Sequence, residues 1–305
     1  MELFDLSLLH STMRMFTPIL LAALGGLLCA RVGVFNVGLE GLVLIGAFSA
    51  IVGNYFTDNL IVAVTVAMLS GMIFSFLLAF MTIQLKANEI VVGIAINFLA
   101  LGLTTFLLRT IFDVKGAFYD SSMRGLPRVD VPLLSDIPAV GVLFQSQTPL
   151  VYVALALPFV LYFFLYKTVA GFRLLSVGYN QAAANSLGIR TNAIKYGALG
   201  LSGLLCGLAG AQLSLGQVTM FSEGMTAGRG FVALVATMLG QSHPFGVLGA
   251  SFLFGLADAI STRLQSISIP TQLTSMLPYI LTLLVMFFVR GRGVETNYSN
   301  EQSSR

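Results

Sequence analysis

Long apolar runs follow one another along almost the whole chain, and they restrict the fold more than any other feature of the sequence. A helix needs about 20 consecutive apolar residues to cross the hydrocarbon core of a membrane. Only 10% of the residues are charged, against roughly 25% in a water-soluble domain. The sequence therefore predicts an all-α polytopic membrane protein. About nine transmembrane or re-entrant helices are expected, at 15–30, 34–54, 60–83, 90–111, 149–167, 196–217, 230–241, 245–264 and 272–289.

The 305 residues carry a formal net charge of +3 without a basic stripe or charge block, so no nucleic acid is expected as a partner. The start of the chain lacks the pattern of a signal peptide and is expected to be retained. One set of positive residues falls on the side of the C-terminus: Arg31, Lys86, Lys167, Arg173, Arg190, Lys195, Arg290 and Arg292. A second set falls opposite: Arg14, Arg109, Lys115, Arg124, Arg128, Arg229 and Arg263. Because Lys and Arg favour the cytoplasmic side, we expect the N-terminus outside and the C-terminus inside.

Two connections are longer than the others. Residues 113–148 form an outer loop rich in Asp, Pro and Ser, and residues 168–195 form the main inner connection. Both are too short to be a separate enzyme domain. We therefore expect one transmembrane domain at 1–292, followed by a polar cytoplasmic tail at 293–305.

Two stretches are unusually rich in glycine for membrane spans, at 31–48 and 226–240. They are the second and seventh spans, so the two halves of the chain would enter the membrane in opposite senses. That pattern is typical of transporters built from inverted repeats with broken helices around a midplane pathway. The alternative is that these glycines only allow close helix packing, as we expect for Gly203 and Gly207.

Glu40 is the most informative ionisable residue in the sequence. If a helix runs on from Arg31, Glu40 lies ~13 Å into a hydrocarbon core of about 30 Å. A charge there costs on the order of 3 kcal/mol, so Glu40 is expected to face a polar cavity or a partner. Asn36, one turn earlier, would share its helix face. With Asn97 and Gln241 as weaker candidates, these residues predict a translocation pathway; the alternative is a hydrogen-bond clamp that holds a re-entrant segment.

Two further polar pairs are expected to be structural. Asp258 can pair with Thr262 one turn on, which favours a clamp within a helix. Arg109 and Asp113 have the i,i+4 spacing of a solvated pair near the outer boundary.

Motifs of catalysis and of ATP binding are missing from the sequence. With only His10 and His243 there is no zinc-binding His-Glu-x-x-His helix, and there is no Gly-x-Ser-x-Gly elbow and no Gly-x-x-x-x-Gly-Lys-Ser/Thr loop. The Gly-x-Gly-x-x-Gly-like stretch at 228–233 opens an apolar span instead of following a strand, so it is a chance match. Cys29 and Cys206 lie in apolar runs and are expected to be buried thiols. The chain is therefore not expected to be an enzyme or to hold a cofactor.

The inner connection contains a short polar helix in the stretch GYNQAAANSLGIRTNAIK, residues 178–195. Asn180 is a good N-cap, QAAANSL supplies about two turns, and Gly188 is a natural stop. A face of small alanine side chains allows close approach and loses little entropy on docking. The segment is therefore predicted to bind a cytoplasmic partner.

Four motifs in order resemble the permease subunits of ATP-binding-cassette (ABC) importers, in the superfamily that serves branched-chain amino acids, ribose and nucleosides. The resemblance covers about 12–292. GFRLLSVGYNQAAANSLGIRTNAIKY resembles the cytoplasmic coupling loop, and FNVGLEGLVLIGAF resembles the second-span signature. KANEIVVGIAINFLALGLT and GMTAGRGFVALVATMLGQSHPFGVLGASFLFGLADA are similar to one of the two permeases of bacterial purine-nucleoside importers.

The resemblance implies a place in the bacterial cytoplasmic membrane, surrounded by lipid, and three protein partners. They are a second homologous permease, a cytoplasmic ATPase that binds the ATP, and an extracellular or periplasmic solute-binding protein or lipoprotein. It also implies that the ATPase is contacted by Asn180, Gln181, Ala182, Ala183, Asn185, Gly188 and Ile189.

Other functions stay open from the sequence. A ribose-type or other simple-sugar importer shares the Asn-x-Gly-x-Glu-Gly pattern, so it is the main rival to a nucleoside importer. A self-sufficient carrier driven by protons or sodium, with Glu40 as the titrating residue, would need no other subunit. An intramembrane enzyme is disfavoured because no nucleophile and base are paired.

Overall fold

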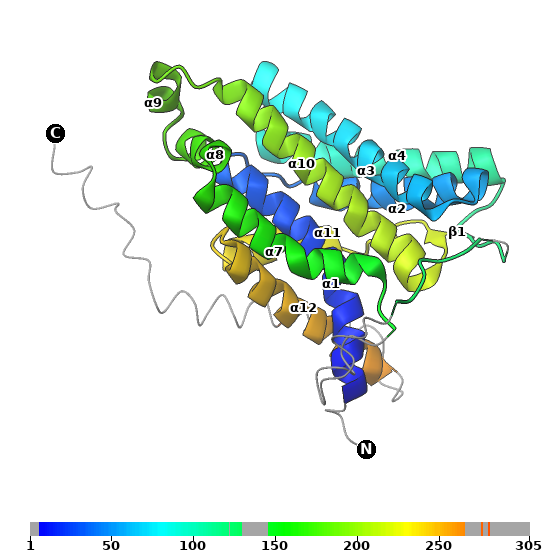
Figure 1. The fold of residues 1–305 in the computed structure, drawn as a ribbon. Coiled ribbons are helices and arrows are strands. Elements are labelled where there is room, and N and C mark those ends of the chain that lie inside the picture. Colours follow the sequence, from blue (N-terminus) through cyan, green and yellow to red (C-terminus); the bar gives the residue numbers. More distant parts are fainter. Residues whose placement is uncertain (1–5, 122, 130–145, 266–275, 277–279, 281–305) are drawn as a thin grey trace. The chain divides into compact units, whose positions relative to one another are not determined.

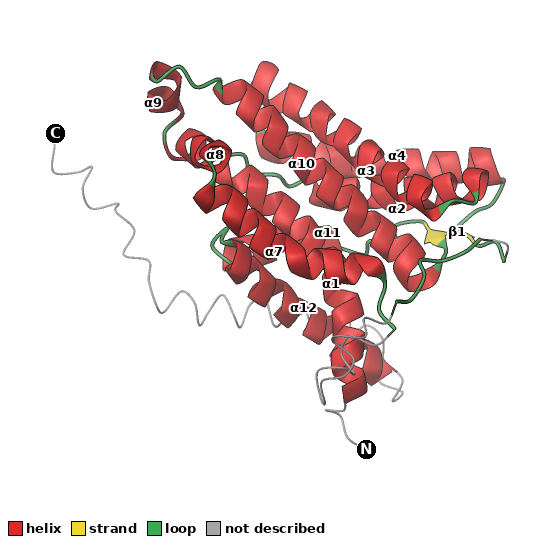
Figure 2. Ribbon diagram, viewed as in Figure 1, coloured by secondary structure: helices red, strands yellow, loops and turns green. Residues whose placement is uncertain are grey.

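The computed structural model describes residues 6–121, 123–129, 146–265, 276 and 280. Regular structure in these residues is helical apart from one short two-stranded sheet (Figure 2). The chain divides into two compact units, Met1–Leu256 and Ala257–Arg305. The predicted all-α class is confirmed, whereas the domain boundary at residue 292 stays a prediction.

Figure 1 shows the order of the helices and the place of the short sheet. The helices are α1 (Leu6–Arg31), α2 (Leu39–Thr57), α3 (Leu60–Ala79), α4 (Glu89–Phe112), α7 (Pro149–Lys167), α8 (Val169–Tyr179), α9 (Gln181–Ser186), α10 (Thr191–Ala211), α11 (Arg229–Leu239) and α12 (Pro244–Gln265). Helices α3 and α10 continue into π-helical turns at Phe80–Gln84 and Gln212–Val218. Strand β1 (Ala117–Phe118) pairs antiparallel with β2 (Phe221–Ser222), with Phe118 opposite Phe221.

Seven helices in the described part of the chain are long and apolar enough to cross a membrane. They cover Ser7–Arg31, Leu39–Thr57, Leu60–Gln84, Glu89–Phe112, Pro149–Lys167, Thr191–Val218 and Pro244–Gln265. Together with the short helix α11 they agree roughly with the expected total of about nine.

Two of the predicted spans are corrected by the structure. The helix expected at 230–241 is present as α11, but its 11 residues extend only ~16 Å, which is too short for a full span. The span at 34–54 was placed too early, since residues 34–36 have no regular structure and α2 begins at Leu39. The predicted span at 272–289 and the tail at 293–305 fall outside the described residues, apart from 276 and 280.

Burial separates the helices of the first unit into inner and outer ones. In the most apolar stretches of α1 and α10, 78% and 83% of the stretch is buried inside the protein, and in that of α2 the buried share is 72%. In the corresponding stretches of α3, α4 and α7 the buried share is only 22%, 28% and 33%. Exposed side chains such as Ile73, Phe98 and Phe163 give these outer helices the apolar surface that lipid requires.

Glycines bring α2 and α10 into backbone contact. A Cβ added to Gly46 of α2 would lie 2.6 Å from the Cα of Gly207 in α10. Gly203 and Gly207 also lie against the backbone of α3, at Gly71 and Ala67. Small residues are what allow membrane helices to approach this closely. The predicted packing role of Gly203 and Gly207 is therefore confirmed.

Arg109 forms a long-range ion pair instead of the predicted local one. Its Nη2 lies 3.4 Å from Oε1 of Glu223, next to strand β2. The predicted pairing with Asp113 is wrong. Helix α4 ends at Phe112, and Asp113 takes a left-handed conformation with φ of 53°, so the helical i,i+4 geometry stops there.

The remaining local expectations agree with the structure in outline. Cys29 and Cys206 are buried free thiols, as predicted. In the second unit, the Thr262 hydroxyl donates a 2.9 Å hydrogen bond to the backbone carbonyl of Asp258. The one-turn contact expected for this pair thus runs through the backbone.

Replacing Gly207 by alanine is expected to destabilise the protein, because a Cβ there would collide with the carbonyl oxygen of Ala67. Overpacking of this kind costs about 1–3 kcal/mol. The matched control is Gly102→Ala, since a Cβ at Gly102 meets nothing within 4 Å. Thermal unfolding in detergent should give a lower midpoint for Gly207→Ala than for Gly102→Ala. Equal midpoints would contradict the close packing of α10.

Candidate functional site

The connection between α1 and α2 is held by a buried asparagine. Asn36 Oδ1 accepts a 3.0 Å hydrogen bond from the Gly38 N–H, and Asn36 Nδ2 donates to Ser202 Oγ at 3.4 Å and to Cys29 Sγ at 3.7 Å. Asn36 is only 2% exposed. It precedes α2, so the expectation that it shares a helix face with Glu40 is wrong. Its side chain instead fixes the non-helical backbone that leads into α2.

Asn97 of α4 binds the start of α2 from the other side. Its Oδ1 accepts a 2.8 Å hydrogen bond from the Gly41 N–H, and its Nδ2 donates a 3.1 Å hydrogen bond to the Val37 carbonyl. Both partners are backbone groups that the helix itself leaves unpaired. Asn97 lies eight residues beyond Glu89, the first residue of α4, which corresponds to ~12 Å along that helix. Helix α2 therefore begins within the thickness of the membrane.

Glu40 joins the start of α2 to the start of α11. It is the second residue of α2, and its Oε1 and Oε2 accept hydrogen bonds of 2.8 and 2.6 Å from the N–H groups of Gly228 and Gly230. Gly228 is the N-cap of α11 and Gly230 lies in its first turn. The first N–H groups of a helix have no partner within it, and its dipole favours negative charge there. One carboxylate therefore lies at two helix N-termini.

The two helix starts also touch through their backbones. A Cβ added to Gly230 would collide with the backbone N and Cα of Glu40. Only glycine leaves room for this approach. We call the contact formed by Asn36, Glu40, Asn97, Gly228 and Gly230 the helix junction. It unites three of the four residues predicted for the pathway.

Gln241, the fourth predicted pathway residue, lies away from the helix junction. It follows the opposite end of α11, in a left-handed turn with φ of 52°, and its side chain is exposed. Its backbone carbonyl accepts a hydrogen bond of 3.5 Å from Arg31 Nη2, and the next carbonyl, that of Ser242, accepts one of 2.7 Å from Arg31 Nε. Arg31 Nη2 also donates to the Tyr166 hydroxyl at 3.0 Å.

Several members of these contacts could not be identified from the sequence pattern. The glycine-rich stretch at 226–240 was interpreted as a possible broken helix, but Gly228 and Gly230 were not predicted to donate to Glu40. Arg31 was used for the orientation of the chain and for the depth of Glu40, and its contacts with the carbonyls after α11 were not predicted. The first N–H groups of a helix need acceptors from elsewhere, and its last carbonyls need donors. Had α11 been recognised as a short helix, both an acceptor and a donor side chain would have been expected at its ends.

The short helix predicted in the inner connection is α9. The Asn180 side chain accepts a 3.0 Å hydrogen bond from the Ala183 N–H, as an N-cap does. At the other end, the Gly188 and Ile189 N–H groups donate to the carbonyls of Asn185 and Ala184, at 2.9 and 3.1 Å. Gly188 has φ of 77°, the left-handed conformation that such a C-terminal motif needs. Both predicted caps are therefore confirmed.

Most of the seven residues expected to contact an ATPase are accessible. Asn180, Gln181, Ala182, Ala183, Asn185 and Gly188 are exposed, and Ile189 is half-buried. Gln181 accepts a 2.8 Å hydrogen bond from Lys195 Nζ, and Asn185 accepts one of 2.9 Å from Thr191 Oγ1. These two bonds tie α9 to the start of α10.

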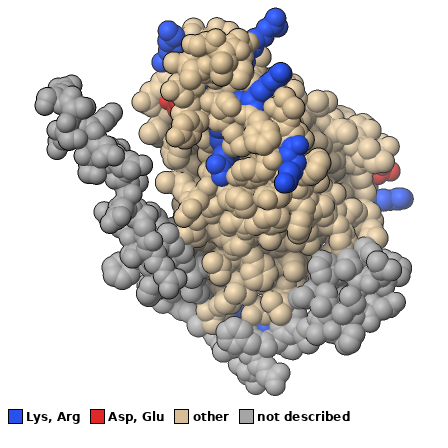
Figure 3. Space-filling view, turned by 60° about the vertical axis from the view of Figure 1, so that its left-hand side comes forward, with Lys and Arg blue, Asp and Glu red and all other residues tan. Residues whose placement is uncertain are grey.

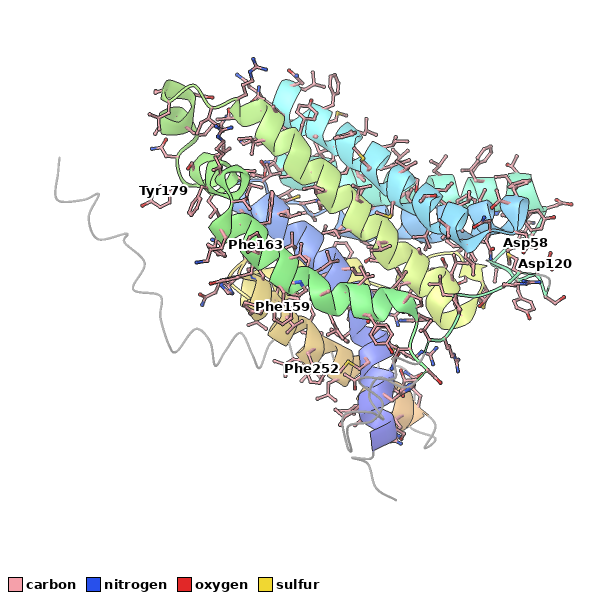
Figure 4. The ribbon with its side chains drawn as sticks, viewed as in Figure 1. Asp58, Asp120, Phe159, Phe163, Tyr179 and Phe252 are labelled. Carbon is pink, nitrogen blue, oxygen red and sulfur yellow. The ribbon has the colours of Figure 1, made fainter. Side chains whose placement is uncertain are left out.

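Two large apolar side chains that were not predicted from the sequence lie beside α9. Tyr179 is 95% exposed and Leu187 is 80% exposed. Both line a cavity of about 590 Å³ together with Phe172, Ala183 and Arg31, between α8, α9 and the end of α1. Figure 4 shows Tyr179 pointing away from the helices, with Asp58 and Asp120 at the opposite end of the unit. We call α8 and α9, together with the exposed side chains of Tyr179 and Leu187, the inner segment.

Basic side chains surround the inner segment. Figure 3 shows Lys and Arg gathered on the upper part of the molecule, the part that contains α8 and α9 in Figure 1. The sequence places Lys167, Arg173, Arg190 and Lys195 in or next to this segment. This distribution agrees with a cytoplasmic position of the inner segment.

Residues 8–286 match the family described as "Branched-chain amino acid transport system / permease component". The guanosine ABC transporter permease protein NupQ of Bacillus subtilis is 36% identical over 286 residues, which cover 90% of this chain and 89% of the relative. The nucleoside ABC transporter permease protein NupC of Lactococcus lactis is 36% identical over 91% of this chain and 90% of its own. The putative glucose ABC transporter permease protein TsgC13 of Haloferax volcanii is 34% identical over 92% and 85%.

A solved structure is also similar. It is titled "An inward-facing conformation of a putative metal-chelate type ABC transporter", and it matches 92% of this chain with 17% identity and a TM-score of 0.50. This likeness concerns the fold, which is that of an ABC transporter permease.

In the described residues, seven helices are long and apolar enough to cross a membrane, α2 among them, and the short helix α11 starts against the start of α2. These features define a multi-pass membrane protein. The chain belongs to the permease components of the branched-chain amino acid transport system family, and is thus an ABC transporter permease of the cytoplasmic membrane.

Replacing Asn97 by leucine is expected to lower the stability of the protein, because it leaves the Gly41 N–H and the Val37 carbonyl without their partner. A buried unpaired polar group costs about 1–3 kcal/mol. Phe98→Leu is the matched control, since Phe98 is the next residue and is 70% exposed. Thermal unfolding in detergent should separate the two variants. If Asn97→Leu unfolds at the temperature of Phe98→Leu, Asn97 does not hold the start of α2.

Proposed function

We propose that this chain is one permease subunit of an ATP-driven importer for nucleosides. Two relatives that cover about nine-tenths of the chain at 36% identity are named as guanosine and nucleoside permeases, and this observation carries the proposal. The chain supplies membrane helices for the pathway, and other subunits supply solute capture and energy. A second homologous permease and an extracellular or periplasmic solute-binding protein or lipoprotein complete the pathway.

The energy comes from ATP hydrolysis on a separate cytoplasmic subunit. The sequence lacks the loop that binds ATP phosphates in such subunits, so this chain holds no ATP of its own. The inner segment offers what a docking partner needs: a short, doubly capped helix, exposed Tyr179 and Leu187, and the cavity beside Ala183. Exposed aromatic anchors beside a pocket are the groups that dominate binding between proteins.

A second candidate solute is a simple sugar. It is favoured by the putative glucose permease TsgC13, which is almost as similar to the chain as the two nucleoside permeases. An ion-coupled carrier with Glu40 as the titrating residue is not proposed. Both Glu40 oxygens accept hydrogen bonds from backbone donors, so a proton or ion would have to displace one of them.

Uptake of a labelled nucleoside tests the solute. The chain is produced with the permease, ATPase and binding protein encoded by neighbouring genes, and guanosine uptake into vesicles is measured with and without ATP. We expect uptake only with ATP, reduced by excess adenosine and unchanged by excess glucose or ribose. ATP-dependent uptake of labelled glucose or ribose, with no uptake of guanosine, would favour the sugar importer. Uptake by this chain without ATP or other subunits would contradict both.

Truncating Tyr179 tests the docking surface. Tyr179→Ala should reduce the amount of ATPase that copurifies with the permease by about tenfold or more, since aromatic anchors commonly contribute 2 kcal/mol or more to binding. Tyr119→Ala is the matched control, because Tyr119 is 65% exposed and follows strand β1 in the outer loop. Equal recovery of the ATPase with both variants would exclude Tyr179 from the interface.

A further inference from the structure

Helix α11 is held by a charged side chain at each of its ends. Glu40 accepts from the N–H groups of Gly228 and Gly230 at the N-terminal end. Arg31 donates to the carbonyls of Gln241 and Ser242, which directly follow the C-terminal end. A carboxylate at the N-terminus and a guanidinium at the C-terminus both match the helix dipole. The two charges flank the same connection, between the last residue of α1 and the second residue of α2.

Arg31 also contacts the inner segment through its backbone. A Cβ added to Gly178 of α8 would collide with the Arg31 carbonyl, so these two backbones are packed directly against each other. Gly178 is followed by Tyr179 and then by Asn180, the N-cap of α9. Arg31 lines the cavity between α8 and α9 as well. A displacement of the inner segment therefore acts on Arg31 without an intervening loop.

The Arg31 guanidinium is fixed by an aromatic partner on a third helix. Tyr166 of α7 accepts its hydrogen bond, and the Arg31 Cζ lies 6.0 Å from the centre of the Tyr166 ring. The Tyr166 ring in turn stacks on His243 at 5.7 Å between ring centres, just after the two carbonyls that Arg31 binds. A planar guanidinium can bind the hydroxyl and the carbonyls together, which an ammonium group cannot do with the same geometry.

Helix α11 itself connects the two charged contacts. Its 11 residues form a rod of ~16 Å, and Thr237 within it donates a 2.9 Å hydrogen bond to the Ala23 carbonyl of α1. The rod and the inner half of α1 are thus bonded together. Contacts run without a gap from α8 through Arg31 and α11 to Glu40, at the start of α2.

We propose that Arg31 and Glu40 are positioning residues that make α11 a rigid link, which carries displacements of the inner segment to the start of α2 inside the membrane. This inference rests on the proposed function as an ATP-driven importer and names the internal connection that it requires. Neither residue touches ATP, and neither needs to touch the solute. Loss of either contact leaves ATP hydrolysis running while less solute is moved per ATP.

The first test measures uptake and ATP hydrolysis together, in the complete importer reconstituted in vesicles. Arg31→Gln and Arg31→Lys should each lower the solute moved per ATP by about tenfold, the effect of losing one charged hydrogen bond. Lys167→Gln is the matched control, because it removes one positive charge next to Tyr166 from an exposed position. The ratio should be unchanged in Lys167→Gln. An unchanged ratio in both Arg31 variants would overturn the proposal.

A double variant tests whether the two contacts act in one chain. Glu40→Gln loses one of its two acceptor oxygens, so it should lower the same ratio. If the link is continuous, Arg31→Gln combined with Glu40→Gln should have no lower ratio than the more affected single variant. Independent residues would instead give effects that multiply. Multiplied effects would therefore contradict a shared link.

A distance measurement tests the link separately from the proposed function. Spin labels are placed at Ser186 of α9 and Met238 of α11, both exposed, in a background where Cys29 and Cys206 are replaced by serine. Arg31→Gln should broaden the distance distribution between the labels, and Lys167→Gln should not. An unchanged distribution in Arg31→Gln overturns the link even if the solute is not a nucleoside. Conversely, absence of ATP-dependent uptake by the unmodified complex refutes the proposed function and leaves this measurement valid.

Discussion

The fold depends on one carboxylate that satisfies two helix starts inside the membrane. A charged side chain at that depth costs on the order of 3 kcal/mol on insertion scales. Each hydrogen bond to a charged group contributes about 1.5–3 kcal/mol. The two bonds from Gly228 and Gly230 to Glu40 are therefore of the size needed to offset the burial. They also pair backbone N–H groups that would otherwise be unsatisfied in an apolar environment. Removing the carboxylate would leave the N–H groups of Gly228 and Gly230 without their acceptors.

Close backbone contact follows from the same constraint. A carboxylate has a short reach, so α2 and α11 must meet almost end to end, and Gly230 is the residue that allows it. The same need for close approach recurs between α2, α3 and α10 at Gly46, Gly71 and Gly207. Asn36 and Asn97 complete the arrangement, because Asn36 binds the Gly38 N–H before the start of α2 and Asn97 binds the Gly41 N–H after it. A helix can begin inside a membrane only when neighbouring side chains take over its unpaired groups.

The features that could be predicted from the sequence are those that depend on residues close together along the chain. Both caps of α9 lie within nine residues, Asn180 to Gly188, so their pattern was enough. The sequence could not predict the partners of Glu40, which are 188 and 190 residues away along the chain. The place of Asn36 was mistaken because an apolar run with glycines does not reveal that its first residues are non-helical. Arg109 was paired with the nearest carboxylate, whereas the end of α4 directs it to Glu223.

The helix junction bears on how such a chain can conduct a solute. The side chains of Asn36, Glu40 and Asn97 direct their hydrogen bonds to backbone groups and to Ser202 and Cys29, so binding a solute through the same atoms would require breaking them. A pathway role for these residues stays a prediction. A path whose polar groups are already paired holds a solute only weakly, and weak holding allows release on the far side. Under the proposed importer, selection of the solute would then fall to the proposed solute-binding protein.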